Sequence, residues 1–189
     1  MSARRLSQAI AEGDGISVLV EVGDARAAGI AERAGAEGLV IRASSTDLGA
    51  NLVLPVLAYG PEPDAAAAGA ADAVVLMADG DTLEQLVDRC RELGVEVVIR
   101  VRDDEELERA FEHVYSEIVL LTADRAEDEQ EPRERLLELL PDVPAGKLAI
   151  AELANASRSD VEELERAGVD AVLVTGDVAA LVGDGVPDV

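Results

Sequence analysis

The sequence predicts an α/β fold, a compact (β/α)8 TIM barrel with eight parallel strands. Three observations favour it: eight short apolar runs, amphipathic helix patterns between them, and a helix–glycine–strand unit that recurs along the chain. Continuous apolar runs are typical of strands buried on both faces of a parallel sheet. An open doubly wound sheet fits the same pattern, and we expect the closed barrel.

The expected strands follow one another at short intervals. Four are apolar runs that stand alone, at Ile16–Val22, Leu54–Tyr59, Glu117–Thr122 and Leu148–Glu152. The other four close the copies of the recurring unit, which are Glu32–Ile41, Ala68–Leu76, Glu92–Ile99 and Glu165–Val174. Each copy has a glycine where the helix should end, namely Gly35, Gly69, Gly94 and Gly168. Glycine is the residue that most readily forms such a helix C-cap.

The helices between the strands have their own markers. The segment Asp81–Gly94 repeats apolar residues at helical spacing, which predicts one buried stripe that includes Cys90. Helix starts are expected at Asp81, Asp103 and Ser159, each of which has a glutamate three residues later. The expected helices at Thr46–Leu52 and Asp64–Ala70 are short, so the barrel is pared down.

Composition limits the function classes. With 189 residues, 49% of them apolar, we expect one barrel domain over 1–189, with a helical lead-in at 1–15 and an acidic tail at 184–189. A net charge of −24 makes nucleic acid and membrane partners unfavourable. One cysteine and no apolar N-terminal run lead us to expect a cytoplasmic protein. Lysine chemistry would depend on Lys147, the only lysine.

Polar residues close most of the expected strands. The active sites of such barrels lie at the C-terminal ends of the strands. The polar residues there are Glu21, Arg42, Tyr59, Asp79, Arg100, Arg102, Thr122, Asp124, Glu152, Thr175 and Gly176. We expect any functional site among them.

Several stretches resemble the indole-3-glycerol phosphate synthase family. Ala71–Met77, Leu86–Gly94 and Val98–Leu107 are similar to its fourth and fifth units, and Leu148–Glu152 and Asp160–Val174 to its seventh and eighth. The resemblance implies a barrel that closes an indole ring on an anthranilate-derived ribulose phosphate, with loss of carbon dioxide and water. In that chemistry lysines act as general acids and glutamates stabilise charge.

Compared position by position, the resemblance implies a changed site. Glu21 and Glu152 match family glutamates, whereas Gly23 and Tyr59 stand where the family has its lysines. Other substitutions replace family polar motifs: Arg100-Val-Arg102, Leu121-Thr-Ala123, Leu153-Ala154 after the glutamate, and Thr175-Gly176 followed by Asp177 in the phosphate-binding part. A carboxylate at a helix N-terminus opposes a bound phosphate.

Two interpretations of the carboxylates stay open. Glu21 and Glu152 could form an acid/base pair, with Tyr59 as a replacement acid, or they could balance Arg100 and Arg102 in a salt-bridged mouth.

The arginines suggest a ligand. Arg42, Arg100 and Arg102 are candidates to clamp a small anion or a sugar phosphate, with Thr175 and Gly176 beside it.

We therefore expect a diverged family member without the standard synthase activity, which serves as a small-anion-binding module or binds a protein partner. The alternative is a genuine synthase, or a sugar-phosphate enzyme with altered acids. No cofactor and no metal are expected, because Cys90 belongs to an apolar stripe and His113, the one histidine, lies near a helix end. The acidic stretch Glu127–Glu131 is expected to be a solvated loop.

Overall fold

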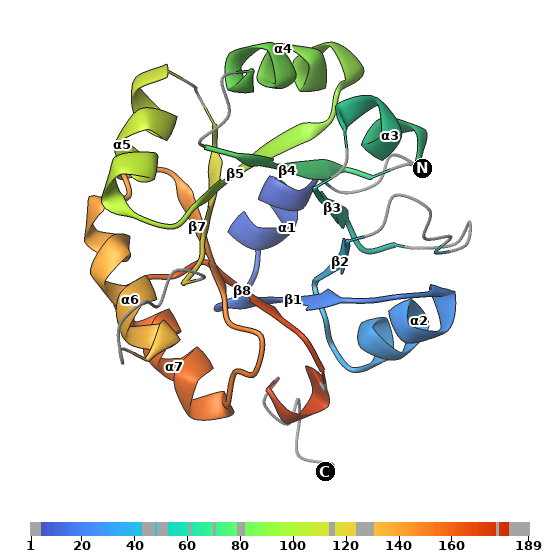
Figure 1. The fold of residues 1–189 in the computed structure, drawn as a ribbon. Helices are drawn as coiled ribbons and strands as arrows, with labels where there is room; N and C mark the ends of the chain where they lie inside the picture. The colour runs from blue at the N-terminus through green and yellow to red at the C-terminus, as the bar shows by residue number, and fades with distance from the viewer. Residues whose placement is uncertain are drawn as a thin grey trace.

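Eight parallel strands close into a barrel in chain order. The computed structural model describes residues 5–42, 48, 53–60, 62–69, 71–78, 82–113, 116–123, 131–176 and 178–181. Its strands are β1 (Ser17–Glu21), β2 (Gly38–Ile41), β3 (Val56–Tyr59), β4 (Ala73–Met77), β5 (Glu96–Val101), β6 (Ile118–Leu121), β7 (Leu148–Glu152) and β8 (Ala171–Val174). Because β8 pairs with β1, the sheet has no open edge, and the closed barrel is confirmed (Figure 1).

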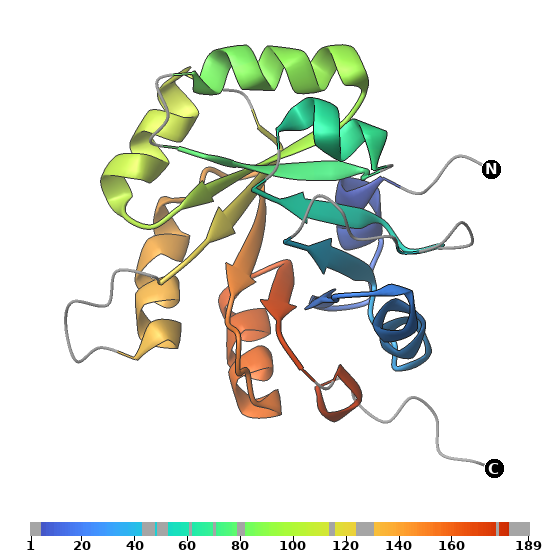
Figure 2. The same cartoon turned by 45° about the vertical axis from the view of Figure 1, so that its right-hand side comes forward.

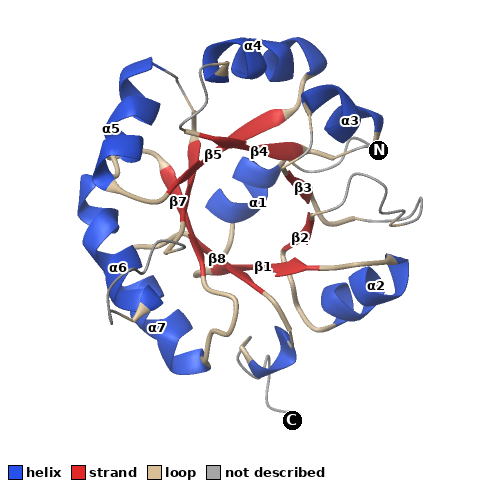
Figure 3. Cartoon of the chain, in the orientation of Figure 1, coloured by secondary structure: helices blue, strands red, loops and turns tan. Residues whose placement is uncertain are grey.

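The helices form a ring outside the strands, with one exception (Figures 2 and 3). They are α1 (Leu6–Ala11), α2 (Ala25–Arg33), α3 (Pro63–Ala68), α4 (Leu83–Leu93), α5 (Asp104–His113), α6 (Pro132–Leu139) and α7 (Arg158–Ala167), with short 3-10 turns η1 (Leu140–Asp142) and η2 (Val178–Ala180). The expected helix at Thr46–Leu52 lies outside the described residues, apart from Leu48.

The exception is α1, which lies in the centre of the ring when the barrel is viewed along its axis (Figure 1). Leu6 and Ile10 are buried and belong to the cluster of side chains that fills the barrel. Ser7 anchors the helix, because its backbone N–H and its hydroxyl both donate to the carboxylate of Glu96 at the start of β5. The helix therefore closes the N-terminal end of the barrel.

Strand and helix ends differ from the predictions for identifiable reasons. β3 begins at Val56 instead of Leu54, because Pro55 has no N–H to donate to the sheet. The start predicted for α7 at Ser159 is wrong: Ser157 is the N-cap and forms a reciprocal capping box with Asp160. Asp103 does cap α5, accepting from the Glu106 N–H at 2.8 Å.

The predicted glycine caps are mostly confirmed. Gly94 and Gly168 end their helices in the left-handed conformation, with φ of 71° and 98°. Gly35 also has a positive φ, of 92°, and follows the cap residue Ala34. Gly69 differs, because it ends the short helix α3 with φ of −80°.

The barrel interior is filled by apolar side chains in layers. Along each strand, residues face inward and outward in turn, and the stagger between strands brings residues from alternate strands to one level. From the N-terminal end upward, the inward residues are Ala73, Ile118 and Ala171 beside Gly38, then Leu19, Leu57, Val98 and Ile150, then Val40, Val75, Leu120 and Leu173. In the described part of the chain, no helix is long and apolar enough to cross a bilayer.

Candidate functional site

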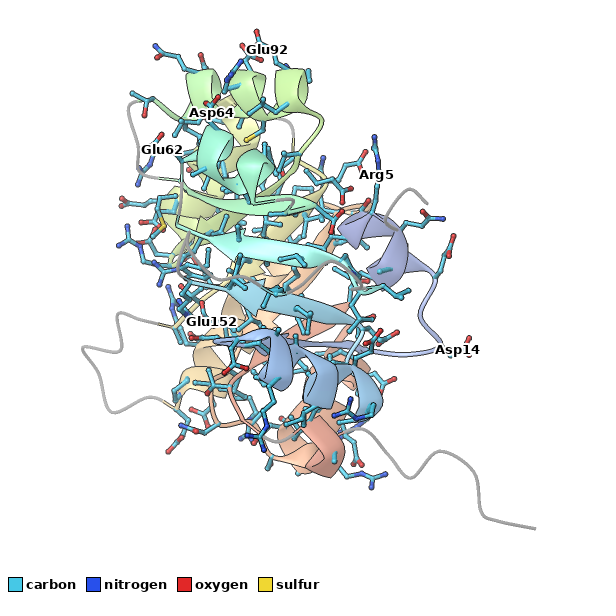
Figure 4. The ribbon with its side chains drawn as sticks, turned by 90° about the vertical axis from the view of Figure 1, so that its right-hand side faces the viewer. Arg5, Asp14, Glu62, Asp64, Glu92 and Glu152 are labelled. Atoms are coloured by element: carbon cyan, nitrogen blue, oxygen red, sulfur yellow. The ribbon has the colours of Figure 1, made fainter. Side chains whose placement is uncertain are left out.

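The next layer upward is polar, and it lies at the C-terminal end of the barrel. The same register that aligns the apolar layers brings four residues of the odd-numbered strands to one level: Glu21 (β1), Tyr59 (β3), Arg100 (β5) and Glu152 (β7). Above them, the even-numbered strands lead to Arg42, Met77, Thr122 and Thr175. Figure 4 shows Glu152 at the end of the barrel opposite Arg5 and Asp14.

One arginine joins Glu21 and Glu152 across this mouth. Arg42 Nε lies 2.6 Å from Glu21 Oε2, and Arg42 Nη2 donates to Glu152 Oε1. The guanidinium also lies over the ring of Tyr59, with Cζ 4.0 Å from the ring centroid. Tyr59 Oη in turn donates to Glu152 Oε2 at 3.1 Å. We call these four residues, Glu21, Arg42, Tyr59 and Glu152, the mouth network.

Exposure decreases from the top of the mouth network to its base. The side chains of Arg42, Glu21 and Glu152 are 39%, 29% and 15% exposed, and Tyr59 is buried. Burial, followed by the charge of Glu152, raises the pKa of the Tyr59 hydroxyl above its ordinary value. Burial lowers the pKa of Arg42, but the hydrogen bonds to both glutamates outweigh it and the net shift is upward. Arg42 therefore stays charged, and Tyr59 is a weaker acid than a free tyrosine.

Arg100 belongs to the same layer but not to the mouth network. Its side chain is buried, its Nη1 lies 3.7 Å from Met77 Sδ, and its Cζ lies 5.8 Å from the centroid of the Tyr59 ring. Glu21 and Glu152 both pair with Arg42 instead of with Arg100 or Arg102. A salt-bridged mouth is thus present, but the partners expected for the glutamates were wrong.

Arg102 lies against helix α5. Its Nε donates to both carboxylate oxygens of Glu106, at 2.8 and 3.1 Å, and its backbone N–H donates to Oε2 at 2.9 Å. The side chain of Glu106 is only 3% exposed. Arg42 and Arg102 are therefore each held by carboxylates of the protein itself, on different elements, and do not form one clamp with Arg100.

The expected phosphate-side residues lie at the end of β8. The Thr175 hydroxyl donates to the carbonyl oxygen of Ala154 at 2.7 Å, and the Thr175 N–H bonds the same oxygen at 3.0 Å. Gly176 follows with φ of 117°, and both residues are exposed. The Thr175 hydroxyl is thus donated to the backbone that connects β7 to α7. Asp79, Asp124 and Asp177 lie outside the described residues, as do residues 127–130 of the acidic stretch.

A cavity of about 520 Å³ adjoins the mouth beyond Glu152. It lies between the segments that follow β6 and β7, and Arg133 and Asn155 are among its polar lining residues. Arg133 Nη1 pairs with Asp160 at 2.9 Å and with Glu163 at 3.3 Å. The sequence analysis missed Arg133 and Asn155. A correctly placed capping box at Ser157 would have indicated that the start of α7 lies here.

Neither the cysteine nor an acidic cluster provides a reactive or metal centre in the described residues. Cys90 is buried in the outer core, and burial raises the pKa of its thiol to about 11, which disfavours the thiolate. Among the residues that the structure describes, no group of three or more His, Cys, Asp or Glu side chains could hold a metal ion. His113 is the last residue of α5.

Comparison with known proteins points to one family. Residues 63–180 match the family model of indole-3-glycerol phosphate synthase. The synthase of Variovorax paradoxus is 35% identical over 107 residues, 55% of this chain, and that of Nautilia profundicola is 32% identical over 114 residues, 59% of this chain. These matches span 40% and 43% of the two synthases, so less than half of each relative is covered.

Solved structures show the fold alone, because their sequence identity is low. N-acetylmannosamine-6-phosphate 2-epimerase from Clostridium perfringens superposes with a TM-score of 0.72 and 15% identity, covering 87% of this chain and 88% of the epimerase chain. Thiamine phosphate pyrophosphorylase from Pyrococcus furiosus gives 0.69 and 14%, covering 88% and 93%. Both likenesses extend over nearly the whole barrel.

Proposed function

Because this chain belongs to the indole-3-glycerol phosphate synthase family, we propose that it is a non-catalytic member, a binding module without the standard synthase activity. The position of its one lysine carries the proposal. Lys147 immediately precedes β7, so it lies at the N-terminal end of the barrel, opposite the mouth. In the sequence resemblance, Gly23 and Tyr59 stand where the family has lysines. With Lys147 at the opposite end, the mouth has no lysine ammonium group to act as a general acid.

The remaining polar groups do not replace that acid. Both glutamates are bound to the Arg42 guanidinium, and the Tyr59 hydroxyl already donates a hydrogen bond to Glu152. Since burial raises the pKa of Tyr59, this hydroxyl releases a proton less readily than a free phenol. A synthase that uses Tyr59 as its acid is the less supported alternative.

The ligand we propose is a small anion or sugar phosphate that binds near Arg100. A protein partner is the alternative. We propose a cytoplasmic location, without nucleic acid or membrane partners. In a chain of net charge −24, an anion needs a local cation. Arg100 is the buried arginine that lies within the polar layer, at the level of Tyr59.

Titration with inorganic phosphate, with the heat of binding measured by calorimetry, tests the binding part of the proposal. We expect saturable heat for the wild-type chain and none for Arg100→Met, which keeps much of the side-chain length without the charge. Arg102→Met serves as the matched control and should bind as the wild type does. Equal binding by all three chains would contradict a site at Arg100.

Glutamine substitutions test the non-catalytic part. We expect the purified chain to form no indole-3-glycerol phosphate from the family's ribulose phosphate substrate. Glu21→Gln and Glu152→Gln should change its stability and nothing else. Turnover that falls in these variants while they stay folded would contradict the proposal.

A further inference from the structure

The groups that bind the Arg42 guanidinium have the chemistry of a binding site for an organic cation. Glu21 and Glu152 accept hydrogen bonds from two different nitrogens of one guanidinium, and Tyr59 offers its ring face at 4.0 Å. Paired carboxylates and an aromatic face are the groups with which proteins bind guanidinium and alkylammonium ligands. The three groups come from β1, β7 and β3, so the barrel itself fixes their separation.

We infer that the mouth is a guanidinium-binding site and that Arg42 is its internal occupant. The ligand class is a small organic cation that carries a guanidinium or a primary amine and takes the place of the Arg42 side chain. This cation would bind at the position of Arg42, whereas the anion proposed above binds near Arg100. The inference rests on the proposed function only in that the mouth takes a ligand.

The order of the layers shows which group is the occupant. Arg42 follows the last residue of β2 and lies one level above Glu21, Tyr59 and Glu152, and it is the most exposed member of the mouth network. The backbones of the groups beneath it are fixed by paired strands, independently of Arg42. Among the described members of the mouth network, Arg42 is therefore the side chain that must move for the site to open.

The balance of charge favours a cation at this position. In the mouth network two carboxylates face one guanidinium, and removal of Arg42 leaves both carboxylates beside the buried Tyr59 ring, with Glu152 still accepting the Tyr59 hydrogen bond. Half-buried carboxylates that lose their only cation are costly, so an organic cation that fits between them is bound more favourably there than in water. The net charge of −24 also concentrates cations at the surface.

A second arginine provides a matched control. Arg89 on α4 is also held by two carboxylates, with Nε 3.1 Å from Asp64 and Nη1 2.9 Å from Glu92. All three side chains are exposed, and within the described part of the chain no aromatic ring lies beside the Arg89 guanidinium. Removing Arg89 therefore leaves the same number of carboxylates, but they are exposed and have no aromatic ring beside them.

The test is a titration with ethylguanidinium chloride at constant ionic strength. Binding is measured by calorimetry, and stability is measured by thermal unfolding. Arg42→Ala should bind it saturably and gain thermal stability, whereas Arg89→Ala should do neither. The wild-type chain should bind about tenfold more weakly or worse, because Arg42 must leave first. Adding Glu152→Gln to Arg42→Ala should weaken binding by about tenfold, because one charge-assisted hydrogen bond is lost. Tetramethylammonium chloride, which has no N–H, should bind more weakly.

Clear results would overturn the inference. A folded Arg42→Ala chain that shows no saturable binding, or that binds equally with Glu152→Gln, excludes the site. If Arg42→Ala does not fold, Arg42→Gln takes its place, and failure of both to fold or bind with ethylguanidinium present also excludes the site. Synthase turnover by the wild-type chain would defeat the proposed function but leave these results unchanged, so the two failures are distinguishable.

Discussion

The ion pair of Arg102 and Glu106 tests whether Arg102 has a structural role outside the mouth. Glu106 is a nearly buried carboxylate, and Arg102 supplies three donor groups to it: the backbone N–H, Nε and Nη2. We predict that Arg102→Met destabilises the fold and leaves the mouth unchanged. The substitution removes two of these donors and keeps the third.

The expected magnitude follows from what remains around Glu106. Removing one partner of a fully buried pair costs about 3–5 kcal/mol. Arg102 is 18% exposed and its N–H still bonds the carboxylate, so we expect about 2–3 kcal/mol, less than the fully buried case. Because a barrel of this size loses about 2–4 °C in Tm per kcal/mol, the melting temperature should fall by roughly 4–12 °C.

A double-mutant cycle in urea measures the pair directly. The double variant Arg102→Met with Glu106→Leu removes both charges of the pair, so its stability should return to within about 1 kcal/mol of the wild type. Phosphate binding should be the same in every member of the cycle. A single variant that costs less than about 0.5 kcal/mol, or one that abolishes phosphate binding, would refute this assignment of Arg102.

Three further predictions concern the floor, the outer ring and the mouth. Leu6→Ala should cost about 2–5 kcal/mol in urea unfolding because Leu6 is fully buried in the barrel floor, and Gln8→Ala on the exposed side of α1 should cost little. Ser157→Ala removes the cap of α7 and should cost about 1 kcal/mol in the same assay, so an unchanged midpoint would contradict the capping box. Burial raises the pKa of Tyr59 above its ordinary value of 10.0, so its contribution to stability should be complete below that pH and lost as pH rises through the folded pKa. Tyr59→Phe should remove that loss, and tyrosinate absorbance should show one late-titrating group.

The sequence predicted the barrel well because the patterns that indicate each strand and helix lie within short segments of the chain. Apolar runs and glycine caps report on each strand and helix separately, and Gly94 and Gly168 took the predicted conformation. The errors at Leu54 and Ser159 were also local: Pro55 delays the start of β3, and an earlier serine supplies the better cap.

The arrangement of the mouth was harder to predict. That Glu21 and Glu152 meet Arg42 depends on the stagger of the closed sheet, which no segment encodes alone. Arg100 and Arg102 are two residues apart, which is the spacing of side chains on one face of a strand. β5 ends at Val101, however, and the alternation ends there, which lets Arg102 turn to Glu106.

We propose that this barrel, which has no lysine at its mouth, does not perform the ring closure. The most direct measurement is product formation from the anthranilate-derived ribulose phosphate, with the chain in excess over substrate so that a single slow turnover is detected. We predict no indole-3-glycerol phosphate above the buffer control. Product formation that Glu152→Gln abolishes in a folded chain would contradict the claim.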